Sequence, residues 1–124
     1  MRLRDLKRFV RALLPNVHIT SSRRLPGSVM GLAWLTDAGP VIAYAQGMTE
    51  RDRDLTLLHE LAHHVYGDTR MRSPYGRVPD ASTLSDDEAR AEVARVLPIW
   101  LREQWREDRA DRWAEETLQL LEGT

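Results

Sequence analysis

Apolar residues recur every three or four positions in the first fourteen residues, at Leu3, Leu6, Val10 and Leu13. This spacing places them on one face of a helix and predicts a helix from about Leu3 to Leu14. Lysine and arginine residues interrupt the apolar positions, so the segment lacks the continuous apolar centre of a secretory signal. We interpret it as an amphipathic helix that docks on the core of the protein, rather than as a targeting or membrane-surface helix.

Three short extended segments are predicted after this helix, at Val17–Thr20, Met30–Leu35 and Val41–Ala45. A loop at Ser21–Ser28 separates the first two, and turn-forming residues between the last two predict a hairpin. Because proline has no backbone N–H to donate, Pro40 suits an edge strand or the first residue of a strand. The Val41–Ala45 segment is therefore a candidate edge strand.

A second helix is expected to begin at Thr49, since Asp52 follows at the spacing of a capping box. It would run through Tyr66 and end at Gly67, because glycine is the usual residue just past a helix end. The segment Asp68–Thr83, which contains two prolines, a glycine and three arginines, is predicted to be a mobile loop.

A third helix is expected after Ser85, because Glu88 completes another capping box. It would reach about Leu97. Pro98 would then either kink this helix or begin a new one that continues to about Leu121.

Strands followed by grouped helices favour an α+β fold, here with a small, largely antiparallel sheet of about three strands packed on helices. The length of 124 residues fits one domain spanning positions 1–124.

Composition narrows the classes of function that the chain can have. The formal net charge is −1, which disfavours nucleic acid as a partner, although five basic residues gather near the N-terminus. The sequence has no cysteine, so it forms neither disulfides nor thiolate zinc sites, and a cytoplasmic location is expected. The apolar runs fall short of the roughly 18–20 residues that span a bilayer, so no membrane partner is expected.

Residues 59–63 read His-Glu-Leu-Ala-His. Residues four apart on a helix share one face, so the imidazoles of His59 and His63 can bind the same zinc ion. Glu60 lies beside them, where a carboxylate can serve as the general base of a zinc-dependent peptidase. The alternative is a buried helix whose histidines are satisfied by hydrogen bonds, which accounts less readily for two histidines at ligand spacing.

A catalytic zinc site has three protein ligands and one open position. Glu88, Glu92 and Glu107 are the candidates for the third ligand. Glu88 is already expected to serve in a capping box, and Glu92 has no distinguishing surroundings. Glu107 opens a helix face of small residues that includes Ala110 and Ala114, so its helix could approach the zinc-binding helix closely. We favour Glu107, with Glu88 and Glu92 as alternatives.

The run Glu107-Asp108-Arg109-Ala110-Asp111-Arg112-Trp113-Ala114 resembles the glutamate helix of gluzincin metallopeptidases. Together with Thr56–His64, it is similar to the CAAX-prenyl-protease and HtpX-like families with their minigluzincin relatives, and to ImmA/IrrE-type peptidases. The resemblance implies a zincin-like fold, with Glu107 as the third zinc ligand and Asp111 orienting a ligand histidine. The segment ending in Leu97-Pro98 could instead match the segment that follows the glutamate helix in these families, which would place the ligand at or near Glu88.

We therefore expect a zinc metalloendopeptidase of the gluzincin type, in which Glu60 is the general base and a zinc-activated water attacks the peptide bond. An extended protein or peptide substrate would pair with the Val41–Ala45 edge. Four side chains could assist the developing oxyanion: Tyr66, Tyr75, His64 and His18. A regulatory protein partner is a further expectation. The alternative function is a non-enzymatic interaction or regulatory module with a structural or vestigial zinc site.

Overall fold

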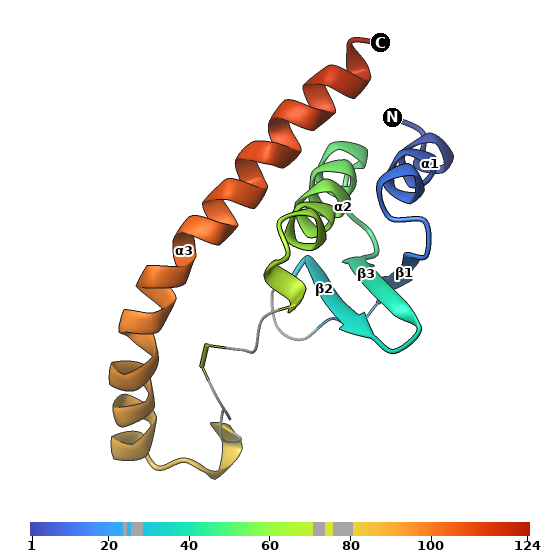
Figure 1. The fold of residues 1–124 in the computed structure, drawn as a ribbon. Helices are drawn as coiled ribbons and strands as arrows, with labels where there is room; N and C mark the ends of the chain where they lie inside the picture. The colour runs from blue at the N-terminus through green and yellow to red at the C-terminus, as the bar shows by residue number, and fades with distance from the viewer. Residues whose placement is uncertain (24, 26–28, 71–73, 76–80) are drawn as a thin grey trace.

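The computed structural model of the 124-residue chain describes residues 1–23, 25, 29–70, 74–75 and 81–124. The elements in chain order are α1 (Leu3–Leu13), β1 (His18–Ser22), β2 (Gly31–Thr36), β3 (Gly39–Ala45), α2 (Glu50–Val65), the 3₁₀ turns η1 (Asp68–Arg70) and η2 (Ala81–Thr83), and α3 (Asp86–Glu122). Within these described ranges the chain forms a small α+β structure with three α-helices and one three-stranded sheet (Figure 1), which confirms the predicted class.

The strand order of the sheet is β1-β3-β2. β2 and β3 form the predicted hairpin and run antiparallel, whereas β1 lies parallel to β3 on its other side. The sheet is therefore mixed, and the prediction of a largely antiparallel sheet is wrong for one of its two strand pairs.

β3 is the central strand, so the prediction that Val41–Ala45 forms an edge is also wrong. The segment from Val41 to Tyr44 is buried throughout, which agrees with its place in the middle of the sheet. The pairing of β1 with β3 begins at Val41, opposite His18, so Pro40 lies just outside it. A proline near the start of a central strand is tolerated here because β1 does not need its N–H.

The core lies between the sheet and the helices. Leu6 and Val10 of α1, together with Leu57 and Leu61 of α2, are fully buried against Ile42 of β3. α3 lies along α2 in Figure 1, and the two helices are in extensive contact. Their contact is close because the buried side of α3 is made of small residues and one leucine, namely Ala110, Ala114 and Leu118.

α3 is one continuous helix of 37 residues with Pro98 inside it, rather than two helices joined at the proline. Its C-terminal half packs on α2, whereas its N-terminal half extends beyond the sheet and α2 toward η2 (Figure 1). The helix changes direction near its middle (Figure 1). A bend is expected near a proline, because its ring blocks one hydrogen bond of the helix. Along the projecting half, apolar side chains are exposed at Val93, Leu97 and Leu101.

The predicted N-caps at Thr49 and Ser85 are confirmed, and the complete capping box is found at Ser85. The Thr49 hydroxyl accepts a hydrogen bond from the Asp52 amide at the start of α2. Ser85 and Glu88 form both hydrogen bonds of a capping box at the start of α3. Gly67, with a φ of 79°, follows the end of α2 in the left-handed region that glycine adopts without strain.

The predicted loops Ser21–Ser28 and Asp68–Thr83 lie partly outside the described residues. Within them, β1 continues through Ser22, and the turns η1 and η2 occupy the two ends of the second segment. None of the helices in the described part of the chain combines the length and the apolar character needed to cross a bilayer.

Candidate metal centre

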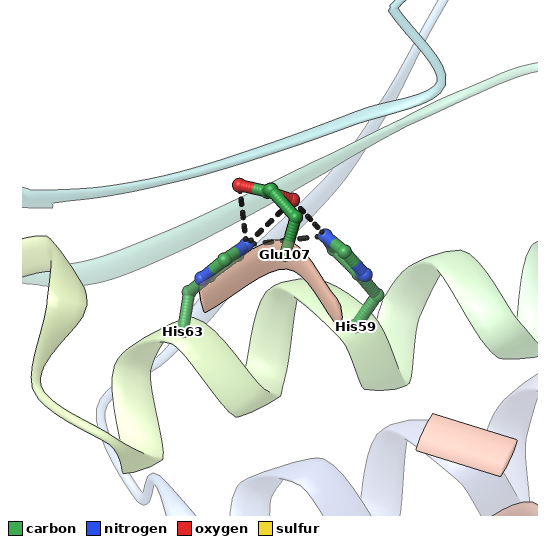
Figure 2. Close-up of side chains that lie close together, drawn as sticks. All are labelled: His59, His63 and Glu107. Carbon is green, nitrogen blue, oxygen red and sulfur yellow. Dashed lines mark hydrogen bonds and ion pairs between the residues drawn. The ribbon is translucent and has the colours of Figure 1, made fainter. Parts of the chain in front are cut away.

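α2 presents His59 and His63 on one face, as the four-residue spacing predicts. The centroids of their rings lie 4.7 Å apart and the ring planes are nearly perpendicular, at 82°. The two Nε2 atoms face each other at 3.1 Å. Figure 2 shows both rings leaning from the helix toward the same point.

Glu107 of α3 lies between the two rings in Figure 2, with its carboxylate beside their facing nitrogens. Its Oε2 atom lies 2.8 Å from His59 Nε2 and 3.3 Å from His63 Nε2. The three side chains form a group that could hold a metal ion, with one potential ligand atom from each and all of these atoms within 4.8 Å of one another. The other two candidates for the third ligand have different partners, since Glu88 caps α3 and Glu92 pairs with Arg95.

The remaining ring nitrogens are held by two carboxylates. Asp111 of α3 lies 2.6 Å from His59 Nδ1, and Asp68 of η1 lies 2.9 Å from His63 Nδ1. An ionised carboxylate can only accept a hydrogen bond, so each Nδ1 must donate. In a neutral imidazole this leaves a lone pair on Nε2, which is the form that binds a metal.

These donors fit a small tetrahedral cation such as zinc. Two neutral imidazole nitrogens and a carboxylate oxygen are usual zinc ligands, at bond lengths of about 2.0–2.2 Å. Tetrahedral geometry at these lengths puts ligand atoms roughly 3.3 Å apart. The separations of 2.8, 3.1 and 3.3 Å need only a small outward adjustment. Each atom is an acceptor when the rings are neutral, so the cluster as a whole favours a positive charge at its centre.

The pKa values of the cluster show the same preference for positive charge. Burial by itself would lower the pKa of His63, but hydrogen bonds to Glu107 and Asp68 outweigh burial and raise this pKa to about 9. For His59, burial is the largest single influence and lowers the pKa, but the hydrogen bond to Glu107 and the nearby charges of Glu60 and Glu107 together outweigh it, so the pKa is raised. Hydrogen bonds from His59 and His63 lower the pKa of Glu107. The Glu107 carboxylate therefore stays ionised, and its negative charge favours a proton or a metal ion on the rings of both histidines.

Glu60 lies next to the cluster without being part of it. Its Oε1 atom is 3.9 Å from His59 Nε2, and its side chain is 9% exposed. Burial raises the pKa of Glu60, because a carboxylate loses hydration when it is taken out of water. A carboxylate in this environment accepts a proton more readily than an exposed one does.

Gly31 of β2 allows the sheet to lie close to Glu60. A Cβ atom at this position would come within 2.6 Å of Thr56 Cγ2 and 3.0 Å of Glu60 Cγ. Both distances are shorter than ordinary carbon contacts. Any side chain at position 31 would therefore displace Thr56 or Glu60, or push β2 away from α2.

Two open cavities meet at Glu60. The larger, of about 590 Å³, extends past His63 between β2 and α3 and includes Trp34 and Trp100 in its wall. The smaller, of about 350 Å³, extends past His59 and includes Met30 and Leu55. Gly31, Glu60 and Glu107 line both cavities. The candidate metal centre is therefore open to a ligand on both sides.

The side chains suggested as oxyanion donors have different environments. The Nε2–H of His64 donates to the Val41 carbonyl, and its Nδ1 accepts from the Thr69 hydroxyl, each at 2.9 Å, so neither nitrogen faces the cluster. Tyr66 stacks on Arg109. His18 opens β1, at the sheet edge opposite β2. Only Tyr75 among the four lines the larger cavity.

Sequence reasoning missed Gly31, Asp68 and Arg109. Asp68 comes directly after Gly67, the glycine that follows α2, where the chain turns back toward the histidines. An acidic residue at such a turn was the signal in the sequence that could have identified it. The closeness of Gly31 to Glu60 depends on how the sheet sits on α2, and neighbouring residues give no sign of it.

Comparison of the chain with protein-family models, with curated proteins and with solved structures finds no match.

Proposed function

We propose that this protein is a zinc-dependent endopeptidase of the gluzincin type with a zincin-like arrangement of sheet and helices. The observation that carries the proposal is the convergence of His59, His63 and Glu107 on one point, with Glu60 beside it between two open cavities. The family resemblance of the same residues agrees with this geometry.

The three convergent side chains would bind the ion, and Asp111 and Asp68 would hold the two rings in the metal-binding tautomer. Bound zinc supplies a Lewis acid and lowers the pKa of a coordinated water to about 7. A purely structural zinc site has protein ligands at all four coordination positions. Three protein ligands beside open cavities would leave the fourth coordination position for water or substrate.

Glu60 would act as the general base and then as the general acid. Its carboxylate would accept a proton from the attacking water and pass it to the nitrogen of the leaving amine. The burial that raises its pKa suits both steps, since the carboxylate must be ionised first and must then hold the proton. Glu107 is unsuited to this role because its own pKa is lowered.

The substrate strand would pair with β2 rather than with β3. β3 is paired on both sides, whereas β2 is at the edge of the sheet and its residues Gly31–Trp34 line the larger cavity with Glu60. An extended peptide added to β2 would form backbone hydrogen bonds and cross the metal centre. A peptide-inhibitor complex in which the peptide contacts no residue of β2 would contradict this assignment.

The test compares the wild type with Glu60→Gln. The control is Glu116→Gln, which makes the same change at an exposed position of α3. Bound zinc is measured by mass spectrometry of the native protein, and hydrolysis is measured with unfolded protein substrates and a peptide library. We expect all three proteins to bind one zinc ion and only Glu60→Gln to lose hydrolysis. A wild type that binds zinc but cleaves nothing would favour the non-enzymatic module, and one that binds no zinc would overturn both.

A further inference from the structure

Arg109 of α3 lies against two aromatic rings close to the metal centre. The carbon of its guanidinium group is 3.9 Å from the ring centroid of Tyr66 and 4.7 Å from that of Trp105. Stacking on aromatic faces suits the flat, weakly hydrated guanidinium group and restricts its orientation. The two contacts therefore restrict the positions that the cation can take.

The orientation of Arg109 directs its Nη2 atom at Asp68, and the two groups lie 2.9 Å apart at Asp68 Oδ1. The other oxygen of the same carboxylate accepts from His63 Nδ1 at 2.9 Å. The Asp68 side chain is 11% exposed, so these contacts are largely shielded from water. A continuous chain of contacts thus runs from two aromatic rings through a cation and a carboxylate to the second histidine.

Asp68 needs such support because of where it stands. It begins η1, a turn of three residues, directly after Gly67. A short turn of this kind constrains a side chain less than a helix does, whereas Asp111 has the continuous helix α3 around it. The carboxylate that faces His63 is therefore fixed by partners from another element. Arg109 is the close one at 2.9 Å, whereas Arg106 Nε lies 4.0 Å from the same oxygen.

We propose that Arg109 is a positioning residue for the metal centre, which acts through Asp68 to hold the ring of His63 in the orientation and tautomer that bind zinc. This inference rests on the metal-binding part of the proposed function and does not require peptidase activity. One short stretch of α3 therefore contacts or positions both histidines. Glu107 contacts both rings. Asp111 holds the ring of His59, and Arg109 holds that of His63 through Asp68.

The decisive variants are Arg109→Gln, Asp68→Asn and the double variant, with Arg112→Ala as a control at an exposed arginine of the same helix. Zinc affinity is measured by competition of Zn²⁺ with a chromophoric chelator. Loss of a group that orients a metal ligand typically lowers metal affinity about 10–100-fold. We expect about a tenfold loss in each single variant and little further loss in the double variant, because both act on one ring. Arg112→Ala should bind zinc as wild type does.

A second readout separates positioning from general destabilisation. In nitrogen–proton NMR spectra of the zinc-bound protein with labelled histidine, the Nδ1–H proton of His63 should exchange faster with water in Arg109→Gln. The Nδ1–H proton of His59, which pairs with Asp111, serves as the internal reference and should be unchanged. Arg109→Lys keeps the charge but loses the flat fork, so its zinc affinity should fall between those of wild type and Arg109→Gln.

Wild-type zinc affinity in Arg109→Gln, or additive losses in the double variant, would overturn the role of Arg109 while leaving the proposed function intact. A wild type without zinc would instead overturn the proposed function. Should Arg109→Gln prove unfolded by circular dichroism, Arg109→Lys carries the test, with a several-fold loss of affinity expected and an unchanged affinity contradicting the proposal.

Discussion

The Nε2 atoms of His59 and His63 lie 3.1 Å apart, on rings whose other nitrogens are both committed to carboxylates. When both rings are neutral, two lone pairs face each other at this distance, and they repel unless a proton or a metal ion lies between them. Protons and a metal ion therefore compete for the same position, and this competition governs the first prediction.

Zinc affinity should increase steeply with pH. The pKa of His63 is raised to about 9 and that of His59 is also raised, so at neutral pH the cluster holds protons that zinc must displace. Each displaced proton makes affinity rise about tenfold per pH unit until the pH passes the pKa concerned. Chelator competition between pH 6.5 and 9.5 at constant ionic strength measures the slope. An affinity independent of pH over this range would show that the rings are already neutral.

Protonation should also affect the stability of the metal-free protein. A histidine whose folded-state pKa is raised stabilises the fold fully below its unfolded-state pKa, near 6.5, and loses that contribution as pH rises through about 9. We therefore expect the metal-free protein to become less stable between pH 6.5 and 9. Urea unfolding across this range measures the trend, and His63→Gln should flatten it. A metal-free protein that becomes more stable between pH 6.5 and 9 would contradict the raised pKa of His63.

Glu107→Ala should weaken zinc binding more than any change to Asp111 or Asp68, because it removes a ligand rather than a group that orients one. Changes of the second kind cost about 10–100-fold, so we expect a loss beyond about 100-fold. Isothermal titration with Zn²⁺ measures it, and Glu116→Ala provides the control at an exposed glutamate of the same helix. Retention of zinc by Glu107→Ala would indicate that another carboxylate is the third ligand.

Gly31→Ala should reduce both stability and hydrolysis. The added Cβ would lie 2.6 Å from Thr56 Cγ2, and overpacking of this kind costs about 1–3 kcal/mol of unfolding free energy. Because the same atom would crowd Glu60, kcat/KM should fall as well. Thr56→Ser removes the methyl group concerned, so the double variant should recover part of the stability. Urea unfolding and peptide hydrolysis measure the two effects, and a lack of any recovery would place the crowding elsewhere.

Much of this architecture could be predicted from the sequence, because local signals determine it. Capping residues at Thr49 and Ser85 set the starts of α2 and α3, and the apolar spacing set α1. The placement of Glu107 beside the histidines follows from the small residues Ala110 and Ala114, which let two helices approach.

The order of the strands could not be predicted in this way. The hairpin of β2 and β3 is local, but the side of β3 on which β1 pairs depends on the path of the chain between Ser22 and Gly31. The four consecutive apolar residues from Val41 to Tyr44, all of them buried in the structure, were a better guide to a central strand than Pro40 was to an edge. The contact of Asp68 with His63 likewise depends on how the chain leaves α2, which no spacing rule describes.

The two cavities that meet at Glu60 bear on which peptide bonds the proposed peptidase would reach. A polypeptide seated in both would have residues on either side of the carboxylate, so neither of its ends would need to be near the metal. A site that is open on both sides would suit cleavage of internal peptide bonds. It would offer no pocket that binds the terminus of a substrate at a fixed distance from the metal.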